Sequence, residues 1–97
     1  MEIIELKYPS KRTVPRQAHV GVVGSGDLEV LLQPIYGDQS EIRIRTSVDG
    51  YRSTWIAIFE RFFARYDGVV RLEINDAGAT PGVVLLRLEQ AVEISEQ

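Results

Sequence analysis

Two stretches of strict alternation most constrain how this chain can fold. In residues 41–48, one set of alternate positions is apolar or threonine, namely Ile42, Ile44, Thr46 and Val48. The positions between them are charged or polar, namely Glu41, Arg43, Arg45 and Ser47. Residues 70–75 repeat the pattern, with Val70, Leu72 and Ile74 between Arg71, Glu73 and Asn75. A period of two with charges on one side predicts strands of a sheet that has one buried face and one solvent face.

Between these two strands the apolar spacing becomes helical. The large apolar side chains there are Trp55, Ile58, Phe59, Phe62 and Tyr66. Steps of three and four residues place them on one helix face, which we interpret as core packing against a sheet rather than as a cofactor site. Ser53 or Thr54 is predicted to cap the start of this helix, and Gly68 to adopt the left-handed conformation past its end.

The remaining segments complete the element order. Residues 3–8 alternate weakly and predict an edge strand, followed by an irregular segment between Pro9 and Pro15. Residues 19–23 and 28–34 predict a hairpin whose second strand ends at Pro34. Residues 80–92 predict a helix that begins with the pair Thr80 and Pro81, although their adjacent valines also suit a strand.

Together these elements predict one α+β domain over residues 1–97, with an irregular lead-in within residues 1–17. The architecture we expect is a two-layer sandwich, in which two helices cover a mainly antiparallel β-sheet.

The amino-acid composition excludes several kinds of functional site. The chain has no cysteine, which excludes disulfides, thiolate metal sites and a cysteine nucleophile, and we predict no metal site. Its single histidine, His19, lies at the start of a predicted strand. A serine–histidine–acid hydrolase would depend on that one residue, so we do not expect one.

The charge distribution bears on partners. The formal net charge is -3, and the basic excess is confined to the first 18 residues. An acidic remainder argues against nucleic-acid binding, while the basic start could touch a phosphate or acidic partner, or could simply be solvated. The sequence has neither an apolar run of membrane-spanning length nor a cationic secretory leader, so we expect a cytoplasmic protein without membrane contact.

The candidate functional residues lie in the hairpin loop GSGD, where Ser25 stands between Gly24 and Gly26 and is followed by Asp27. A plain hairpin turn accounts for this pattern. A phosphate-binding loop would need a helix directly after it, and here a strand follows. The remaining interpretation is a serine modified by another enzyme, since the glycines remove side chains on both sides and Asp27 could orient the hydroxyl or accept a backbone N–H.

Several segments closely resemble the acyl carrier family of malonate decarboxylase, often called its delta or C subunit. These segments are VGVVGSGDLEVLLQP, TSVDG, WIAIFERFF and INDAGATPGVVLLRLEQA, and the resemblance covers residues 18–91. A more distant resemblance is to the acyl carrier (gamma) subunit of citrate lyase, which has a comparable SGD loop. That subunit also looks helical in its C-terminal segment, which supports a helix over residues 80–92.

The resemblance implies that Ser25 bears 2'-(5''-phosphoribosyl)-3'-dephospho-CoA through a phosphodiester, installed by a separate transferase from a triphosphate precursor. It implies a non-catalytic carrier that holds acetyl and malonyl thioesters while malonate is converted to acetate and CO2. Since the chain has no thiol, the sulfur of such a thioester must come from the attached group. A phosphopantetheine arm is not expected, because those carriers are helical bundles with an Asp-Ser-Leu motif at a helix start.

The implied partners are the acyl-transferase (alpha) subunit, the decarboxylase (beta and gamma) subunits, a malonyl transferase and the prosthetic-group transferase. We expect them to dock at the hairpin loop with Asp27 and Glu29, unless these are merely solvated charges. A citrate lyase carrier and an unmodified interaction module remain the alternatives.

Overall fold

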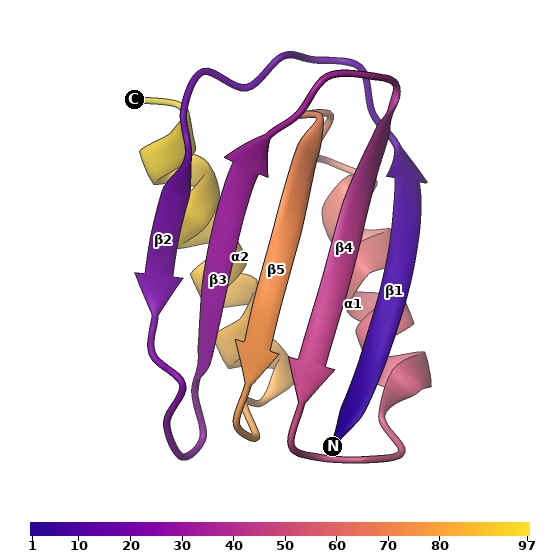
Figure 1. Ribbon diagram of the computed structural model, residues 1–97, viewed down its shortest axis with the longest axis vertical. Helices are drawn as coiled ribbons and strands as arrows, with labels where there is room; N and C mark the ends of the chain where they lie inside the picture. The colour runs from indigo at the N-terminus through magenta and orange to yellow at the C-terminus, as the bar shows by residue number, and fades with distance from the viewer.

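The computed structural model describes all residues from 1 to 97 and consists of one sheet and two helices (Figure 1). In chain order the elements are β1 (Glu2–Pro9), β2 (Ala18–Gly21), β3 (Leu28–Pro34), β4 (Gln39–Thr46), α1 (Arg52–Phe63), β5 (Val70–Asp76) and α2 (Pro81–Ser95). Both helices lie on the same face of the sheet. Neither helix is of a length and hydropathy that would let it cross a bilayer.

The strands are arranged in the order β1-β4-β5-β3-β2. β4 and β5 pair in parallel because α1 carries the chain back between them, and the other three pairings are antiparallel. The predicted α+β sandwich with a mainly antiparallel sheet is therefore confirmed. β1 is the edge strand that its weak alternation predicted, and the helix predicted over residues 80–92 is α2.

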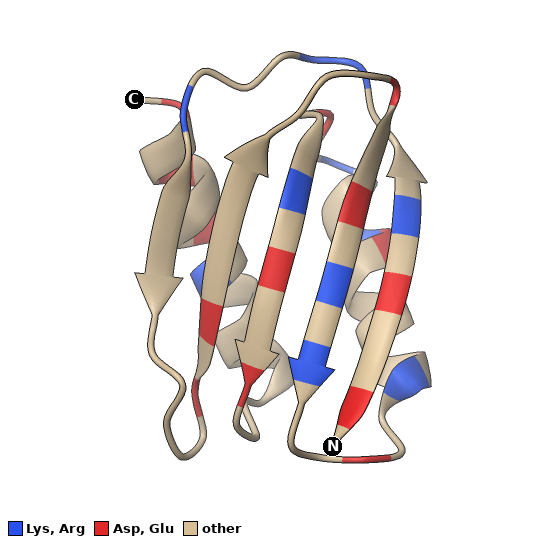
Figure 2. Ribbon diagram, in the orientation of Figure 1, with Lys and Arg blue, Asp and Glu red and all other residues tan.

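The core lies between the sheet and the helices. The inward strand positions are buried as the alternation predicts, with Ile44 and Leu72 fully inaccessible. α1 contributes Trp55, Ile58 and Phe59 to this core, which confirms that its aromatic face serves packing. The opposite face of the sheet carries both acidic and basic residues on β1, β4 and β5 (Figure 2), and opposite charges face each other across the strands, as Glu5, Arg43 and Glu73 do.

The start of α1 differs from the prediction. Ser53 and Thr54 lie inside the first turn, and Tyr51 occupies the cap position without a side-chain hydrogen bond. The reason is the reversal directly after β4, where Gly50 adopts a φ of 86° and brings Tyr51 into position to accept the Trp55 N–H at 3.0 Å. The helix therefore begins before either predicted cap residue.

The end of α1 also differs. The helix ends at Phe63, and Gly68 lies in the following loop without a positive φ. Glycine is needed there for a close approach, because a Cβ on Gly68 would lie 2.6 Å from Cγ2 of Val14. Tyr66, predicted on the helix face, lies beyond the helix but is still buried in the core.

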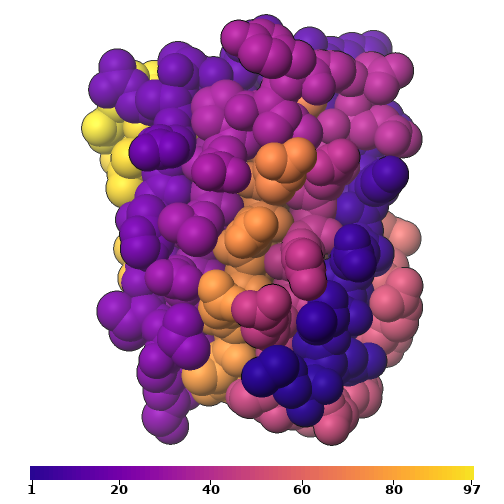
Figure 3. Space-filling view, in the orientation of Figure 1, coloured from indigo at the N-terminus to yellow at the C-terminus, as the bar shows by residue number.

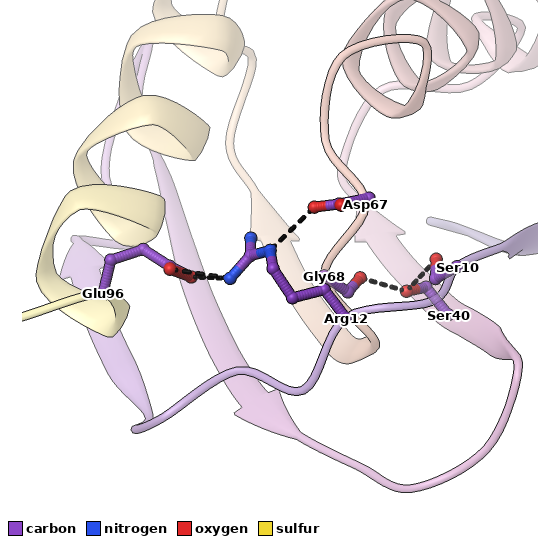
Figure 4. A network of polar contacts seen from close by, with 6 residues as sticks. All are labelled: Ser10, Arg12, Ser40, Asp67, Gly68 and Glu96. Atoms are coloured by element: carbon purple, nitrogen blue, oxygen red, sulfur yellow. Dashed lines mark hydrogen bonds and ion pairs between the residues drawn. The ribbon is translucent and has the colours of Figure 1, made fainter.

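The segment after β1 has no regular secondary structure, as predicted, yet it is firmly attached. Arg12 donates to Asp67 at 2.7 Å and to both carboxylate oxygens of Glu96 at 2.8 Å (Figure 4). Its backbone also pairs with Asp67 and Val69. The basic start of the chain is thus bound to the α1–β5 loop and the end of α2, and the interpretation of a flexible solvated lead-in is wrong for Arg12.

One predicted inward residue lies outside its strand. β4 ends at Thr46, and Val48 sits in the following loop with 36% of its surface exposed. The Thr46 hydroxyl accepts the Val48 N–H at 3.1 Å, which turns the chain away from the sheet. Val48 therefore lies at the end of the molecule, next to the start of α1.

Candidate functional site

The hairpin loop is longer than predicted. β2 ends at Gly21, so the loop runs from Val22 to Asp27. Gly21 adopts a φ of 78°, which interrupts the extended strand conformation. Glycine is needed at this position because a Cβ there would overlap the Leu28 carbonyl. Val22 and Val23, predicted as strand residues, are instead 64% and 61% exposed in the loop.

Ser25 lies in a tight turn at the tip of this loop. The Gly24 carbonyl accepts the Asp27 N–H at 2.9 Å, which makes residues 24–27 a β-turn with Ser25 in its second position. Gly26 occupies the third position with a φ of 75°, the conformation that a type II turn requires there. The loop projects from the end of the molecule at the lower left of Figure 3.

The Ser25 side chain is exposed, and its hydroxyl bonds to no other group of the chain. Asp27 does not orient this hydroxyl, since its Oδ1 accepts the Leu28 N–H at 2.7 Å instead. The imidazole of His19 bonds to Glu29 at 2.8 Å and does not reach the serine. The hydroxyl is therefore accessible but has no internal base, so another molecule must activate it for any reaction.

A charge pair fastens the loop to α2. Arg87 donates from Nε to Asp27 Oδ1 at 3.0 Å and from a terminal nitrogen to Oδ2 at 2.7 Å. This forked contact, followed by the Leu28 N–H, holds the pKa of Asp27 below its ordinary value. The same contact raises the pKa of Arg87. Both side chains are largely covered, at 27% exposed for Arg87 and 19% for Asp27.

A second attachment runs through the backbone. Gly26 donates its N–H to the Ala77 carbonyl at 2.8 Å, and Ala77 donates back to the Asp27 carbonyl at 2.9 Å. These two bonds continue the β3–β5 pairing beyond the strands and tie the serine turn to the β5–α2 loop. Ser25 is thus carried by a turn that is held from two sides.

The two glycines beside Ser25 have different roles in the fold. Gly26 needs its positive φ, although a Cβ there would meet nothing within 4 Å. Gly24 has no positive φ, and a Cβ there would make only an ordinary contact with Val22 at 3.8 Å. The fold therefore requires glycine at position 26 but not at position 24.

The acidic residues expected to dock partners are already paired within the chain. Glu29 accepts from the Asn75 amide at 2.9 Å and bonds His19 at 2.8 Å, contacts that hold its pKa below the ordinary value. Asp27 is paired with Arg87. A docking role for Asp27 and Glu29 remains a prediction. Val22 and Val23 are the exposed apolar side chains of the loop.

Two of the residues that position the turn were not found from the sequence. Arg87 stands 60 residues from Asp27, and no local pattern links them. Ala77 acts only through its backbone. Gly21 could have been recognised, because an isolated glycine within a strand pattern often marks a close backbone approach.

Residues 15–95 match the acyl-carrier family model described as Malonate decarboxylase delta subunit (MdcD). The chain belongs to this family. Curated malonate decarboxylase acyl carrier proteins from Azotobacter vinelandii and Pseudomonas fluorescens Pf-5 are 47% and 46% identical to it, over 96% of this chain and 95% of each relative.

The same fold is found in a solved structure of a malonate decarboxylase. A chain in the crystal structure of a Pseudomonas malonate decarboxylase hetero-tetramer in complex with malonate superposes with a TM-score of 0.93 at 45% identity. The match covers 97% of this chain and 98% of that one. The family match decides between the two carrier families considered from the sequence, in favour of malonate decarboxylase over citrate lyase.

Proposed function

We propose that this chain is the acyl carrier subunit of a multi-subunit malonate decarboxylase and that Ser25 is its attachment residue. The group attached would be 2'-(5''-phosphoribosyl)-3'-dephospho-CoA, which supplies the thiol that carries the acetyl or malonyl group. The observation that carries the assignment is the Ser25 hydroxyl, exposed and unbonded at the tip of a turn held by Arg87 and Ala77.

The residues around Ser25 fit such a linkage. A phosphodiester needs a free hydroxyl with open space around it, and the flanking Gly24 and Gly26 supply no side chain. The chain has no cysteine, so it cannot form a thioester on its own atoms. The fixed turn limits where the linkage can point, which raises the local concentration of whatever is attached at a neighbouring active site.

Attachment itself needs a second enzyme. The Ser25 oxygen would bond to the ribose-linked phosphorus of the triphosphate precursor, and the bond to the outer two phosphates would break, releasing diphosphate. The serine proton would go to a base of the prosthetic-group transferase, because none contacts Ser25 here. Asp27 helps by holding the turn through Arg87, so that the transferase meets one conformation of the loop.

The carrier needs no catalytic residue under this proposal. The acyl-transferase (alpha) subunit, the malonyl transferase and the decarboxylase (beta and gamma) subunits would act on the arm in turn, converting malonate to acetate and CO2. The chain's contribution is tethering. The similar chain of known structure belongs to a malonate decarboxylase hetero-tetramer, which supports a carrier with several partner subunits.

The deciding experiment is intact mass spectrometry of the chain co-expressed with the transferase and precursor-forming enzymes. We expect one mass increment equal to the phosphoribosyl-dephospho-CoA group, lost in Ser25→Ala and retained in Ser53→Ala. Ser53 is a suitable control because it is also exposed and bonds to no other group. An unmodified wild-type chain would favour the unmodified interaction module, and an increment that survives Ser25→Ala would move the attachment site.

A further inference from the structure

A pocket opens at the same end of the molecule as the serine turn. It has a volume of about 290 Å3 and lies between the first turns of the two helices. Its walls come from the β4–α1 and β5–α2 connections, which lie at the same end as the hairpin loop (Figure 1). The proposed function does not use this pocket.

The floor of the pocket is apolar and well packed. Trp55, Ile58 and Val84 are at most 7% exposed and belong to the core. At the rim, Val48 and Tyr51 are 36% and 53% exposed, so apolar surface continues out to the mouth. Exposed apolar side chains around a concave apolar floor are typical of a ligand site.

The polar groups within the pocket are almost all satisfied by the chain. Asp76 accepts the Ala79 N–H at 3.0 Å, the Gly78 N–H at 3.1 Å and the Thr46 hydroxyl at 2.9 Å. The Thr80 hydroxyl accepts the Val83 N–H. The walls thus hold a carboxylate whose oxygens already have partners, and they leave little that would bind an ion.

Two hydroxyls at the mouth remain free. Those of Thr54 and Tyr51 line the pocket and bond to no other group of the chain. No lysine, arginine or histidine lines it. This combination suits a neutral, narrow ligand with an amide or carbonyl group, and it disfavours a carboxylate, which would be buried beside Asp76 without a cation.

The pocket and the serine turn share one loop. Ala77 bonds to the backbone of Gly26 and Asp27, and the next two residues, Gly78 and Ala79, line the pocket. Because consecutive residues span at most about 3.6 Å each, the mouth lies only a few residue lengths from Ser25. A CoA-like arm on Ser25 is longer than this distance and can fold back to the pocket.

We propose that this pocket holds the acetyl end of the arm attached to Ser25 and rejects the malonyl end. The inference depends on the proposed function, since it needs an arm on Ser25. The neutral acetyl thioester would be sheltered from water against Trp55, whereas the malonyl group carries a carboxylate that the pocket does not compensate. The carrier would then retain the resting acetyl form and leave the malonyl form exposed to the decarboxylase subunits.

Trp55 provides a direct test, because it is the only tryptophan of the chain. The indole N–H resonance and fluorescence of Trp55 would be measured in the unmodified chain and in the acetyl-loaded, malonyl-loaded and free-thiol forms. We expect the acetyl-loaded form to shift the indole resonance and change the emission, and the malonyl-loaded form to leave both as they are in the unmodified chain. Equal shifts in the acetyl-loaded and malonyl-loaded forms would overturn the selectivity for acetyl. An identical Trp55 signal in the acetyl-loaded and unmodified chains would overturn the inference.

Blocking variants make the test specific. Ala79→Leu and Thr54→Leu add bulk from opposite walls, and either should abolish the shift and speed cleavage of the acetyl thioester by hydroxylamine several-fold. Ala64→Leu, at an exposed position away from the pocket, should do neither. A Trp55 signal that changes only when other subunits are added would assign the pocket to a partner and overturn the inference. Absence of the mass increment on Ser25 would instead contradict the proposed function.

Discussion

Arg87 of α2 holds Asp27 of the hairpin loop through two hydrogen bonds, 3.0 Å to Oδ1 and 2.7 Å to Oδ2. The pair joins the last helix to the turn that presents Ser25. Planar two-point contact fixes orientation as well as distance, so the helix sets the direction in which the turn points. This arrangement gives the loop a fixed conformation without using the serine itself.

We therefore predict that Arg87→Gln loosens the turn. The Gly26 N–H, bonded to Ala77 at 2.8 Å, should exchange with solvent faster. Under the proposed function, the rate of prosthetic-group attachment to Ser25 should also fall several-fold. Hydrogen exchange followed by NMR, together with timed mass spectrometry, measures both effects. Arg61→Gln is the matched control, because Arg61 is an exposed helical arginine without an ion pair. Equal exchange rates in the Arg87 and Arg61 variants would contradict the anchoring role.

The Asp27 contact also predicts a pH dependence of stability. The pKa of Asp27 in the fold lies below its ordinary value of 3.8, so the folded chain favours the ionised form. The stability that the pair contributes is fully present above about pH 4 and is lost as the pH falls through the lowered pKa. Asp27→Asn removes this contribution, so the variant should be less stable near neutral pH and approach the wild type in acid.

Urea unfolding at a series of pH values between neutrality and strong acid would measure this difference. Asp38→Asn is the control, since Asp38 is exposed and has no ion pair. A difference between wild type and Asp27→Asn that stays constant over the whole series would rule out the linkage.

Local patterns in the sequence predicted the strands, whereas features set by long-range contacts could not be predicted. Alternation in residues 41–48 and 70–75 predicted the strands correctly, because burial of one sheet face acts on every second residue. The caps of α1 were predicted wrongly, because Gly50 and the contacts of Asp67 with the segment after β1 decide where that helix starts and ends. The contacts of Asp67 come from a distant part of the chain, whereas Gly50 acts locally through its backbone conformation.

The candidate site shows the same division. Ser25 and its glycines stand out because turn chemistry is local. The attachment of the turn to Arg87 depends on how α2 packs across β3, which no spacing in the sequence encodes. The apolar pocket behind the β5–α2 loop depends in the same way on the packing of distant segments, because Val48 of the β4–α1 loop and Thr80 at the start of α2 meet only in the folded chain.

The two glycines that flank Ser25 should respond differently to alanine. Gly26→Ala forces a side chain into the left-handed region, at a cost of about 1–2 kcal/mol in the free energy of unfolding. Gly24→Ala should change that free energy by less than about 0.5 kcal/mol, since neither its conformation nor its surroundings require glycine. If position 24 is glycine because the transferase needs open space beside Ser25, attachment to Ser25 should slow markedly in Gly24→Ala even though the fold stays stable. Chemical denaturation and timed mass spectrometry of both variants separate the two effects, and unchanged attachment in Gly24→Ala would remove the access role.

The last prediction concerns two buried hydroxyls, those of Ser40 and Tyr66, at the end of the molecule opposite the serine turn. Ser40 is fully buried, donates to the Gly68 carbonyl at 2.9 Å, accepts the Val70 N–H at 3.0 Å and bonds Ser10 at 2.8 Å. Ser40→Ala would remove this partner from the buried Gly68 carbonyl and Val70 N–H, and we expect a loss of about 1–3 kcal/mol in the free energy of unfolding.

The hydroxyl of Tyr66 is buried without a hydrogen-bond partner, and burial is the main cause that raises its pKa. Removing an unpaired buried hydroxyl relieves a desolvation cost, so Tyr66→Phe should leave stability unchanged or raise it by up to about 1 kcal/mol. The aromatic ring would keep its packing against Phe62, at 4.9 Å between ring centroids. Thermal and urea unfolding of Ser40→Ala and Tyr66→Phe side by side would measure both changes. A clear loss of stability in Tyr66→Phe would mean that the hydroxyl has a partner in solution, with Ser95 and Arg12 the nearest groups that could provide one.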